Sequence, residues 1–96
     1  MGNLSYTDSY YFLWGRATCP HCVLAANFFV EKALPHITHF LDDRPEILEG
    51  LQQRFKWPTV PLILEYRLDG SQYFIGGREA LVKYIAQQEA KGGPSQ

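Results

Sequence analysis

Residues 11–22 read YFLWGRATCPHC and carry the only two cysteines of the chain. The apolar run at residues 11–14 predicts a buried strand, and the run at residues 23–34, directly after the cysteines, predicts a helix. A Cys-x-x-Cys pair between a strand and a helix in a small protein is typical of a redox dithiol. The spacing places the sulfurs of Cys19 and Cys22 in the first helical turn, close enough to form and break a disulfide.

The size and charge of the chain limit its organisation and its partners. Its 96 residues, 46% of them hydrophobic, predict a single domain over residues 1–96, with residues 1–9 and 91–96 as flexible ends. The net charge of −1 gives no reason to expect a nucleic acid or a membrane surface as partner. No apolar run approaches the roughly 18 residues of a spanning helix. No large exposed apolar stripe is visible, so we expect a monomer.

The first six residues contain neither the basic region nor the apolar region of a secretory signal. Two cysteines without such a signal favour a reducing compartment, where a Cys-x-x-Cys pair is more often catalytic or metal-binding than structural. The expected location is therefore the cytoplasm.

The hydrophobic pattern predicts the element order β-α-β-α-β-β-α. Strands are expected at residues 10–15, 36–41, 60–66 and 72–75, with Asp69-Gly70 as the turn of a terminal hairpin. Helices are expected at residues 20–34, from residue 45 onward with Asp42 and Asp43 as its caps, and around residues 81–88. A strand, a crossover helix and a parallel strand, followed by a hairpin, give a mixed four-stranded sheet with helices packed on it.

Cys19 is the candidate nucleophile, because a thiolate attacks disulfides and a helix N-terminus favours negative charge. The helix dipole contributes roughly 0.3–1 kcal/mol, up to about 2 when partly buried. Lowering a cysteine pKa from about 8.5 to about 5 requires roughly 5 kcal/mol. Hydrogen bonds from the first turn and a nearby cation must supply the rest, and Arg16 is the expected cation. Cys22, one turn further in, is predicted to resolve the mixed disulfide formed at Cys19.

The two residues between the cysteines are predicted to tune the thiolate. Pro20 fits the first helical position, where its missing N–H costs nothing. A protonated His21 would stabilise the Cys19 thiolate and make the pair more oxidising than a tyrosine would. At neutral pH a solvent-facing histidine is mostly uncharged, so the expected shift in potential is small.

Two further motifs point to a substrate groove. Thr59-Val60-Pro61 precedes a strand, and Pro61 is a candidate for a cis peptide bond that leaves the Val60 backbone free to pair with an extended substrate. Gly76-Gly77 lies between a strand and a helix, where glycines let a ligand approach the backbone and the helix N-terminus can bind a carboxylate.

Taken in order, the Thr-Cys-Pro-His-Cys, Thr-Val-Pro and Ile-Gly-Gly motifs at residues 18–22, 59–61 and 75–77 resemble the landmarks of dithiol glutaredoxins. The resemblance covers about residues 10–87. It implies an α/β, thioredoxin-like fold with helices on both faces of the sheet and a cis Pro61. It also implies reduction of protein disulfides and glutathione mixed disulfides, with glutathione as the reducing co-substrate.

The resemblance further implies which residues hold glutathione. These positions are Arg16, Thr59, Val60, Pro61, Gly76 and Gly77, with Gln53 as an additional candidate. Among protein clients, the family analogy points to ribonucleotide reductase.

The chain departs from the family pattern in three places. His21 replaces the usual tyrosine of the active site. The segment 78–80, Arg-Glu-Ala, stands where the family has a small residue followed by acidic ones, so Glu79 is a candidate for the missing acid. Trp57-Pro58 before Thr59 is also unusual and is expected to reshape the groove.

Alternative functions remain open from the sequence. The protein could be a redoxin recharged by a thioredoxin reductase, or a metal-binding module. Cys19, Cys22, His36 and His39 have a spacing close to that of a zinc finger, although their histidines are one residue too close. An iron–sulfur cluster bridged by Cys19 and glutathione is the second metal form, which Pro20 disfavours. The leading expectation has no metal.

Overall fold

A computed structural model describes residues 6–91 of the chain. After a short 3₁₀ turn, η1, the elements follow in the predicted order. The strands are β1 (Tyr10–Gly15), β2 (His36–Phe40), β3 (Leu62–Tyr66) and β4 (Gln72–Gly76), and the helices are α1 (Pro20–Glu31), α2 (Pro45–Phe55) and α3 (Arg78–Ala90).

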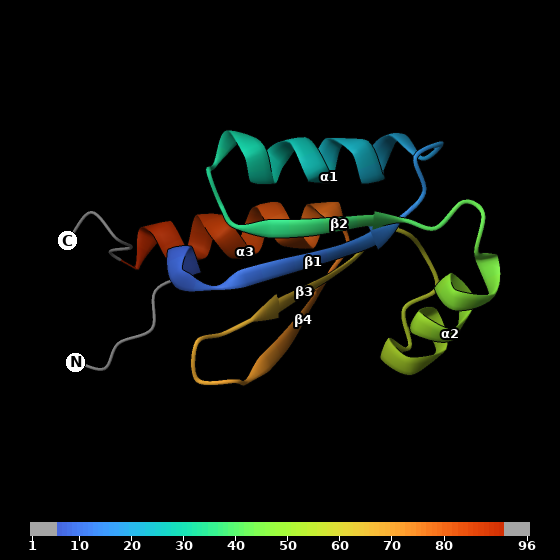
Figure 1. Cartoon of the computed structure of the whole chain (residues 1–96). Helices are drawn as coiled ribbons and strands as arrows, with labels where there is room; N and C mark the ends of the chain where they lie inside the picture. The colour runs from blue at the N-terminus through green and yellow to red at the C-terminus, as the bar shows by residue number, and fades with distance from the viewer. Residues whose placement is uncertain (1–5, 92–96) are drawn as a thin grey trace.

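The four strands form one mixed sheet in the order β2-β1-β3-β4 (Figure 1). β1 pairs in parallel with β2, and it pairs antiparallel with β3, which in turn pairs antiparallel with β4. Gly70 has a positive φ of 89° in the turn between β3 and β4. The predicted crossover connection and the predicted hairpin are therefore both confirmed.

Helices pack on both faces of this sheet, as predicted. Side chains alternate across a strand, so Tyr11 and Leu13 of β1 point into the core that α1 and α3 cover, where Phe29 lies against Tyr11. On the opposite face, Trp14 stacks on Phe55 of α2, with ring centroids 6.2 Å apart. Figure 1 shows α1 and α3 side by side over the sheet and α2 at the end where β1 leads into α1.

Helix α1 ends three residues before the predicted boundary at Leu34. Ala33 adopts a positive φ of 55°, and the N–H groups of Ala33 and Leu34 donate to Val30 and Phe29. This is the Schellman pattern, which normally carries glycine at the left-handed position. Alanine carries no helix-stop signal in the sequence, whereas Pro35 does, which explains the later predicted boundary.

Three strand boundaries also differ from the expectation. The second strand ends at Phe40 and the fourth extends to Gly76. The third begins at Leu62, directly after the cis Val60–Pro61 bond. At the N-terminal end, residues 6–9 are not a loose lead-in: Tyr6–Asp8 form the 3₁₀ turn and Ser9 is buried. Residues 1–5 and 92–96, also predicted as flexible ends, lie outside the described part.

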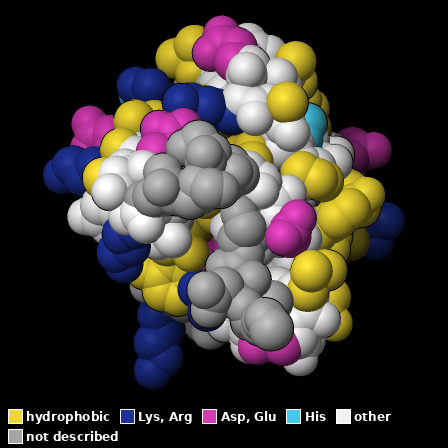
Figure 2. Space-filling model, turned by 90° about the vertical axis from the view of Figure 1, so that its left-hand side faces the viewer, with side chains coloured by type: hydrophobic (Ala, Val, Ile, Leu, Met, Phe, Trp, Pro, Cys, Tyr) yellow, Lys and Arg dark blue, Asp and Glu magenta, His cyan; other side chains and the backbone are white. Residues whose placement is uncertain are grey.

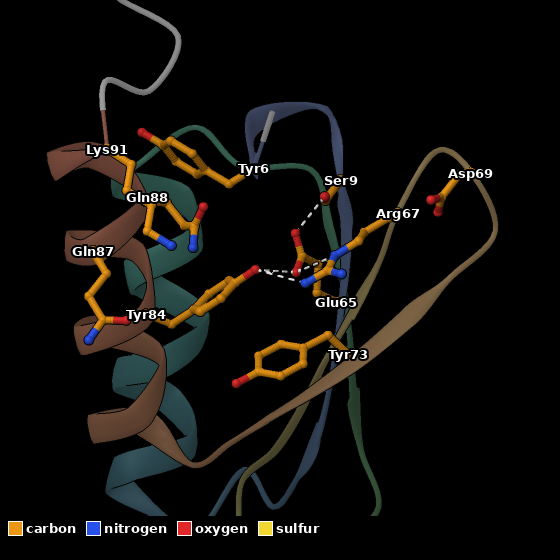
Figure 3. Close-up of a pocket in the computed structure, with 10 residues that line it drawn as sticks. All are labelled: Tyr6, Ser9, Glu65, Arg67, Asp69, Tyr73, Tyr84, Gln87, Gln88 and Lys91. Carbon is orange, nitrogen blue, oxygen red and sulfur yellow. Dashed lines mark hydrogen bonds and ion pairs between the residues drawn. The ribbon is translucent and has the colours of Figure 1, made fainter. Parts of the chain in front are cut away.

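A carboxylate is buried at the end of the sheet remote from the cysteines. Glu65 of β3 is 2% exposed and accepts hydrogen bonds from Ser9 at 2.6 Å, Arg67 at 3.1 Å and Tyr84 at 2.5 Å. Figure 3 shows these groups converging from the junction between η1 and β1, from the turn after β3 and from α3. Burial and the hydrogen bond to Glu65 raise the pKa of Tyr84 to about 12, so its hydroxyl remains a donor. The hydrogen bond between Tyr84 and Glu65 thus connects α3 to β3.

The surface at this remote end mixes acidic and basic side chains (Figure 2). None of the helices within residues 6–91 is long and apolar enough to cross a membrane.

Candidate active site

The two cysteines lie where β1 turns into α1. Cys19 is the N-cap residue with extended backbone, and Pro20 occupies the first helical position, as predicted. The backbone N–H groups of Cys22 and Val23 donate to the Cys19 carbonyl at 3.1 and 3.2 Å. Cys19 is partly exposed and Cys22 is fully buried, and both are free thiols. Only Cys19 is therefore open to an incoming disulfide.

Gly15 makes room for the buried sulfur. A Cβ atom at this position would lie 2.5 Å from Cys22 Sγ, well inside van der Waals contact. The backbone N–H of Arg16 donates to the same sulfur at 3.4 Å. The end of β1 thus packs directly against Cys22 in the first turn of α1.

The environment of Cys19 favours its thiolate. Burial raises its pKa, but hydrogen bonds from the Cys22 thiol and from the backbone of Cys22 and His21, together with the charge of Arg16, outweigh it, so the pKa lies below the ordinary value. The sequence predicted that first-turn hydrogen bonds and Arg16 would lower the pKa of Cys19. It did not predict the hydrogen bond from the Cys22 thiol, which lowers this pKa more than Arg16 does.

Cys22 shows the opposite behaviour. Burial raises its pKa far above the ordinary value, and the Arg16 backbone hydrogen bond opposes this only in part. A neighbouring Cys19 thiolate raises it further. The surroundings therefore favour the thiolate of Cys19 and the protonated thiol of Cys22.

Asp42 has a different role from the one predicted. It does not cap α2, whose N-cap is Arg44 without a side-chain hydrogen bond. Its carboxylate instead accepts hydrogen bonds from the backbone N–H of Ala17 at 2.7 Å and from the N–H and hydroxyl of Thr18. These bonds, the Ala17 one first, lower the pKa of Asp42. Asp42 thus secures the loop directly before Cys19.

A groove of about 580 Å³ runs beside the dithiol. The Thr59-Val60-Pro61 segment forms one wall, and the Val60–Pro61 peptide bond is cis, as predicted. The start of α3 forms the other wall, and His21 lies on the rim nearest the cysteines. The lining residues are His21, Trp57, Thr59, Val60, Pro61, Gly77, Arg78, Glu79, Ala80 and Lys83.

Trp57 explains why the glycine pair is needed here. A Cβ atom at Gly76 would lie 3.1 Å from the Trp57 ring, and Gly76 has a φ of 121°, which L side chains rarely adopt. The Trp57 ring also lies against Gly77. Among residues 6–91, the buried indole N–H of Trp57 is one of two buried side-chain groups without a hydrogen-bond partner. Trp57 is thus part of the groove wall and packs against both glycines.

Most of the predicted glutathione-binding residues line this groove, but Arg16, Gln53 and Gly76 do not. Gln53 lies in a separate hollow with Glu49 and Lys56, on the other side of Trp57. Arg16 is exposed in the loop before Cys19, where its charge acts on both cysteines. The sequence missed the contact between Arg78 and His21, in which the Arg78 guanidinium Nε donates to His21 Nδ1 at 3.3 Å.

The histidines of the zinc alternative lie apart from each other. The His36 ring stacks on Phe29 and its Nδ1 lies 2.9 Å from the Leu34 carbonyl oxygen, on the α1 face of the sheet. His39 lines a hollow with Trp14 on the α2 face. Within residues 6–91, no three His, Cys, Asp or Glu side chains are grouped closely enough to hold a metal. His36 and His39 therefore do not join the cysteines in a zinc-finger arrangement in this structure.

Comparisons with known proteins agree with this architecture. The glutaredoxin family model matches residues 10–64, more than half of the chain. Glutaredoxin 1 from Francisella tularensis is 26% identical, with a TM-score of 0.63 over 82% of this chain and 94% of that chain. The dithiolic glutaredoxin 2-C-Grx1 from Trypanosoma brucei brucei is 23% identical, with a TM-score of 0.66 over 91% and 88%.

A chloroplastic thioredoxin z shares the fold at 16% identity, with a TM-score of 0.58 over 88% of this chain and 80% of that chain. A search among curated proteins gave no match. The family match, the fold and the paired cysteines agree: this chain belongs to the glutaredoxin family and is a dithiol thiol–disulfide oxidoreductase.

Proposed function

We propose that the protein reduces glutathione mixed disulfides and protein disulfides with glutathione as its reductant. The observation that carries the proposal is the groove beside Cys19, in which the cis Val60–Pro61 segment faces the start of α3. It offers an extended backbone for a peptide and a helix N-terminus for a carboxylate. Glu79 lines the same groove and is the candidate partner for the glutathione amino group.

In the first step the Cys19 thiolate attacks a sulfur of the substrate disulfide. A bond forms between Cys19 and that sulfur, the substrate disulfide breaks, and the departing thiolate takes up a proton from solvent. A glutathione thiolate can then attack the sulfur bound to Cys19, which forms a disulfide with that sulfur and releases the Cys19 thiolate. Alternatively, Cys22 attacks Cys19, which forms the Cys19–Cys22 disulfide and releases the bound substrate thiol, and two glutathione molecules then reduce this disulfide and leave as oxidised glutathione. Because Cys22 is buried and its pKa is raised, its own attack must first release a proton, which gives glutathione time to compete.

Glutathione-driven reduction needs a compartment in which reduced glutathione prevails, so the proposal includes a cytoplasmic location. Ribonucleotide reductase is a proposed client by family analogy alone.

The test is turnover of a glutathione mixed disulfide with NADPH, glutathione and glutathione reductase. We expect activity in the wild type, none in Cys19→Ser, and at least partial activity in Cys22→Ser, because glutathione can replace the resolving cysteine. Absence of turnover in the wild type, together with recharging by NADPH and thioredoxin reductase, would replace glutathione by that enzyme as the electron donor.

A further inference from the structure

The groove beside the dithiol carries an excess of positive charge. Arg78 and Lys83 line it, and Glu79 is the only carboxylate among the described residues that do so. Arg78 also contacts the active-site motif directly, because its Nε lies 3.3 Å from His21 Nδ1. A substrate that reaches Cys19 through this groove therefore passes a guanidinium.

Arg78 differs from the arginines that stabilise the fold. Arg44 and Arg67 pair with carboxylates, those of Glu46 at 2.7 Å and Glu65 at 3.1 Å. Within residues 6–91, Arg78 forms no ion pair, and its one hydrogen bond goes to a ring nitrogen of His21. A guanidinium has five N–H donors in a geometry that fits a carboxylate, so most of its binding capacity is free.

The contact also determines which nitrogen of His21 carries the proton. A guanidinium can only donate, so Nδ1 must accept and the ring proton lies on Nε2. A carboxylate is a stronger acceptor than a neutral imidazole, because charge-assisted bonds to Arg are frequently bidentate. A carboxylate entering the groove would therefore take Arg78 from His21.

We propose that Arg78 is a specificity residue that selects protein substrates with a carboxylate next to the target disulfide. A peptide paired with the Val60 backbone would carry the side chain beside its cysteine toward the start of α3, where Arg78 lines the groove. The selection concerns disulfide exchange at Cys19 and requires no glutathione. Salt weakens it, because Arg78 and Lys83 are not buried.

The test uses two peptides whose single cysteine is disulfide-bonded to uncharged 2-thiopyridine. One peptide has Glu on both sides of the cysteine and the other has Gln. Pre-reduced protein attacks the peptide sulfur, the bond to the thiopyridine sulfur breaks, and the released thiopyridone, which takes up a proton, is followed by its absorbance. We expect the wild type to react about five- to tenfold faster with the Glu peptide, and high salt to remove most of this preference.

Three variants separate Arg78 from general charge. In Arg78→Gln the ratio of the Glu-peptide rate to the Gln-peptide rate falls to about one. Arg78→Lys keeps part of the preference, because it retains the charge and loses the planar fork. Arg54→Gln, which removes the same charge from the exposed surface of α2 outside the groove, leaves the preference intact.

The state of His21 gives a second readout that a merely structural role of Arg78 would not change. Nitrogen-15 NMR of the His21 ring should show Nδ1 losing its hydrogen bond when an unreactive Glu peptide, with Ser for Cys, is added, but not with the Gln peptide. Equal rates of the wild type with both peptides, or a preference that survives in Arg78→Gln, would overturn the proposal. Failure of glutathione turnover would leave this assay unaffected, since it uses only the reduced dithiol.

Discussion

The two ends of the sheet differ in whether their charged side chains have partners within the protein. At the end remote from the cysteines, both oxygens of Glu65 are hydrogen-bonded, and its partners come from three separate segments of the chain (Figure 3). At the dithiol end, Cys19 is partly exposed and Arg78 has no carboxylate partner within the described chain. A charged group whose hydrogen bonds are all satisfied within the protein contributes to the fold. A charged group with unused hydrogen-bond donors is available to a substrate.

The two ends also differ in the free-energy cost of leaving a charged group unpaired. An unpaired charge is tolerable at the dithiol end because solvent reaches it, while the same group at the Glu65 end would be buried without compensation. Substitutions at the remote end should therefore change stability and leave chemistry intact. Substitutions at the dithiol end should change reactivity.

Glu65→Ala should produce the largest loss of stability. It leaves Ser9 and the Tyr84 hydroxyl without their acceptor and removes the partner of Arg67, which should cost about 3 kcal/mol of unfolding free energy. Urea unfolding measures this loss, and turnover per folded molecule should stay at the wild-type value.

Glu89→Ala is the matched control, since it breaks the exposed pair with Lys32. Its cost should stay below about 1 kcal/mol. Similar costs for the two substitutions would mean that the buried cluster contributes no more than a surface ion pair.

Gly76→Ala should come next, with a cost of about 2 kcal/mol. The new Cβ would meet the Trp57 ring and Ala80, at a φ of 121° that alanine rarely adopts. Because Trp57 lines the groove, KM for substrate should also rise. Gly50→Ala, in α2 with nothing within 4 Å of the added atom, should be neutral or slightly stabilising. Equal effects of the two alanines would show that Trp57 can move aside freely.

Cys22→Ala should alter reactivity with less effect on the fold. Burial raises the pKa of Cys19, and the hydrogen bond from the Cys22 thiol is the strongest contribution that lowers it. Removing that donor should raise the pKa of Cys19, so alkylation by iodoacetamide should shift to higher pH. Cys22→Ser keeps a donor and should shift the profile less. Identical profiles for the alanine and serine variants would show that the donor has no influence.

Asp42→Ala should have the smallest effect, a fall in kcat/KM of roughly tenfold or less from a loosened loop before Cys19. Because the pKa of Asp42 is depressed below 3.8 in the folded protein, its stabilising effect is complete above that value and is lost as the pH falls through the folded pKa. The wild type and the variant should therefore converge in stability in strong acid. Asp43→Ala is the control, and an equal fall in its kcat/KM would remove the special role of Asp42.

Local sequence patterns were sufficient to predict most of the fold. The strand at residues 10–15, the dithiol at a helix start and the Asp69-Gly70 turn all depend on neighbours in sequence, and each was predicted correctly. The helix stop at Ala33 was missed, because alanine in the left-handed conformation has no signature in the sequence.

Contacts between distant residues account for what could not be predicted in the site. Asp42 meets Ala17 across 25 positions, and Arg78 meets His21 across 57. An acidic residue before a helix is usually a cap, so local reasoning assigned Asp42 to α2. Only the parallel pairing of β1 and β2 brings the loop that follows each strand to the same edge of the sheet.

The packing of Trp57 against the glycines in the groove wall also makes the protein's fluorescence sensitive to the groove. The chain contains two tryptophans. Trp14 lies outside the groove, where it stacks on Phe55, whereas Trp57 lines the groove itself. In a Trp14→Phe background, the emission of the remaining indole would come from the groove wall alone. A peptide or thiol that displaces water there should shift this emission to shorter wavelength, so occupancy of the groove can be followed in real time without any attached label.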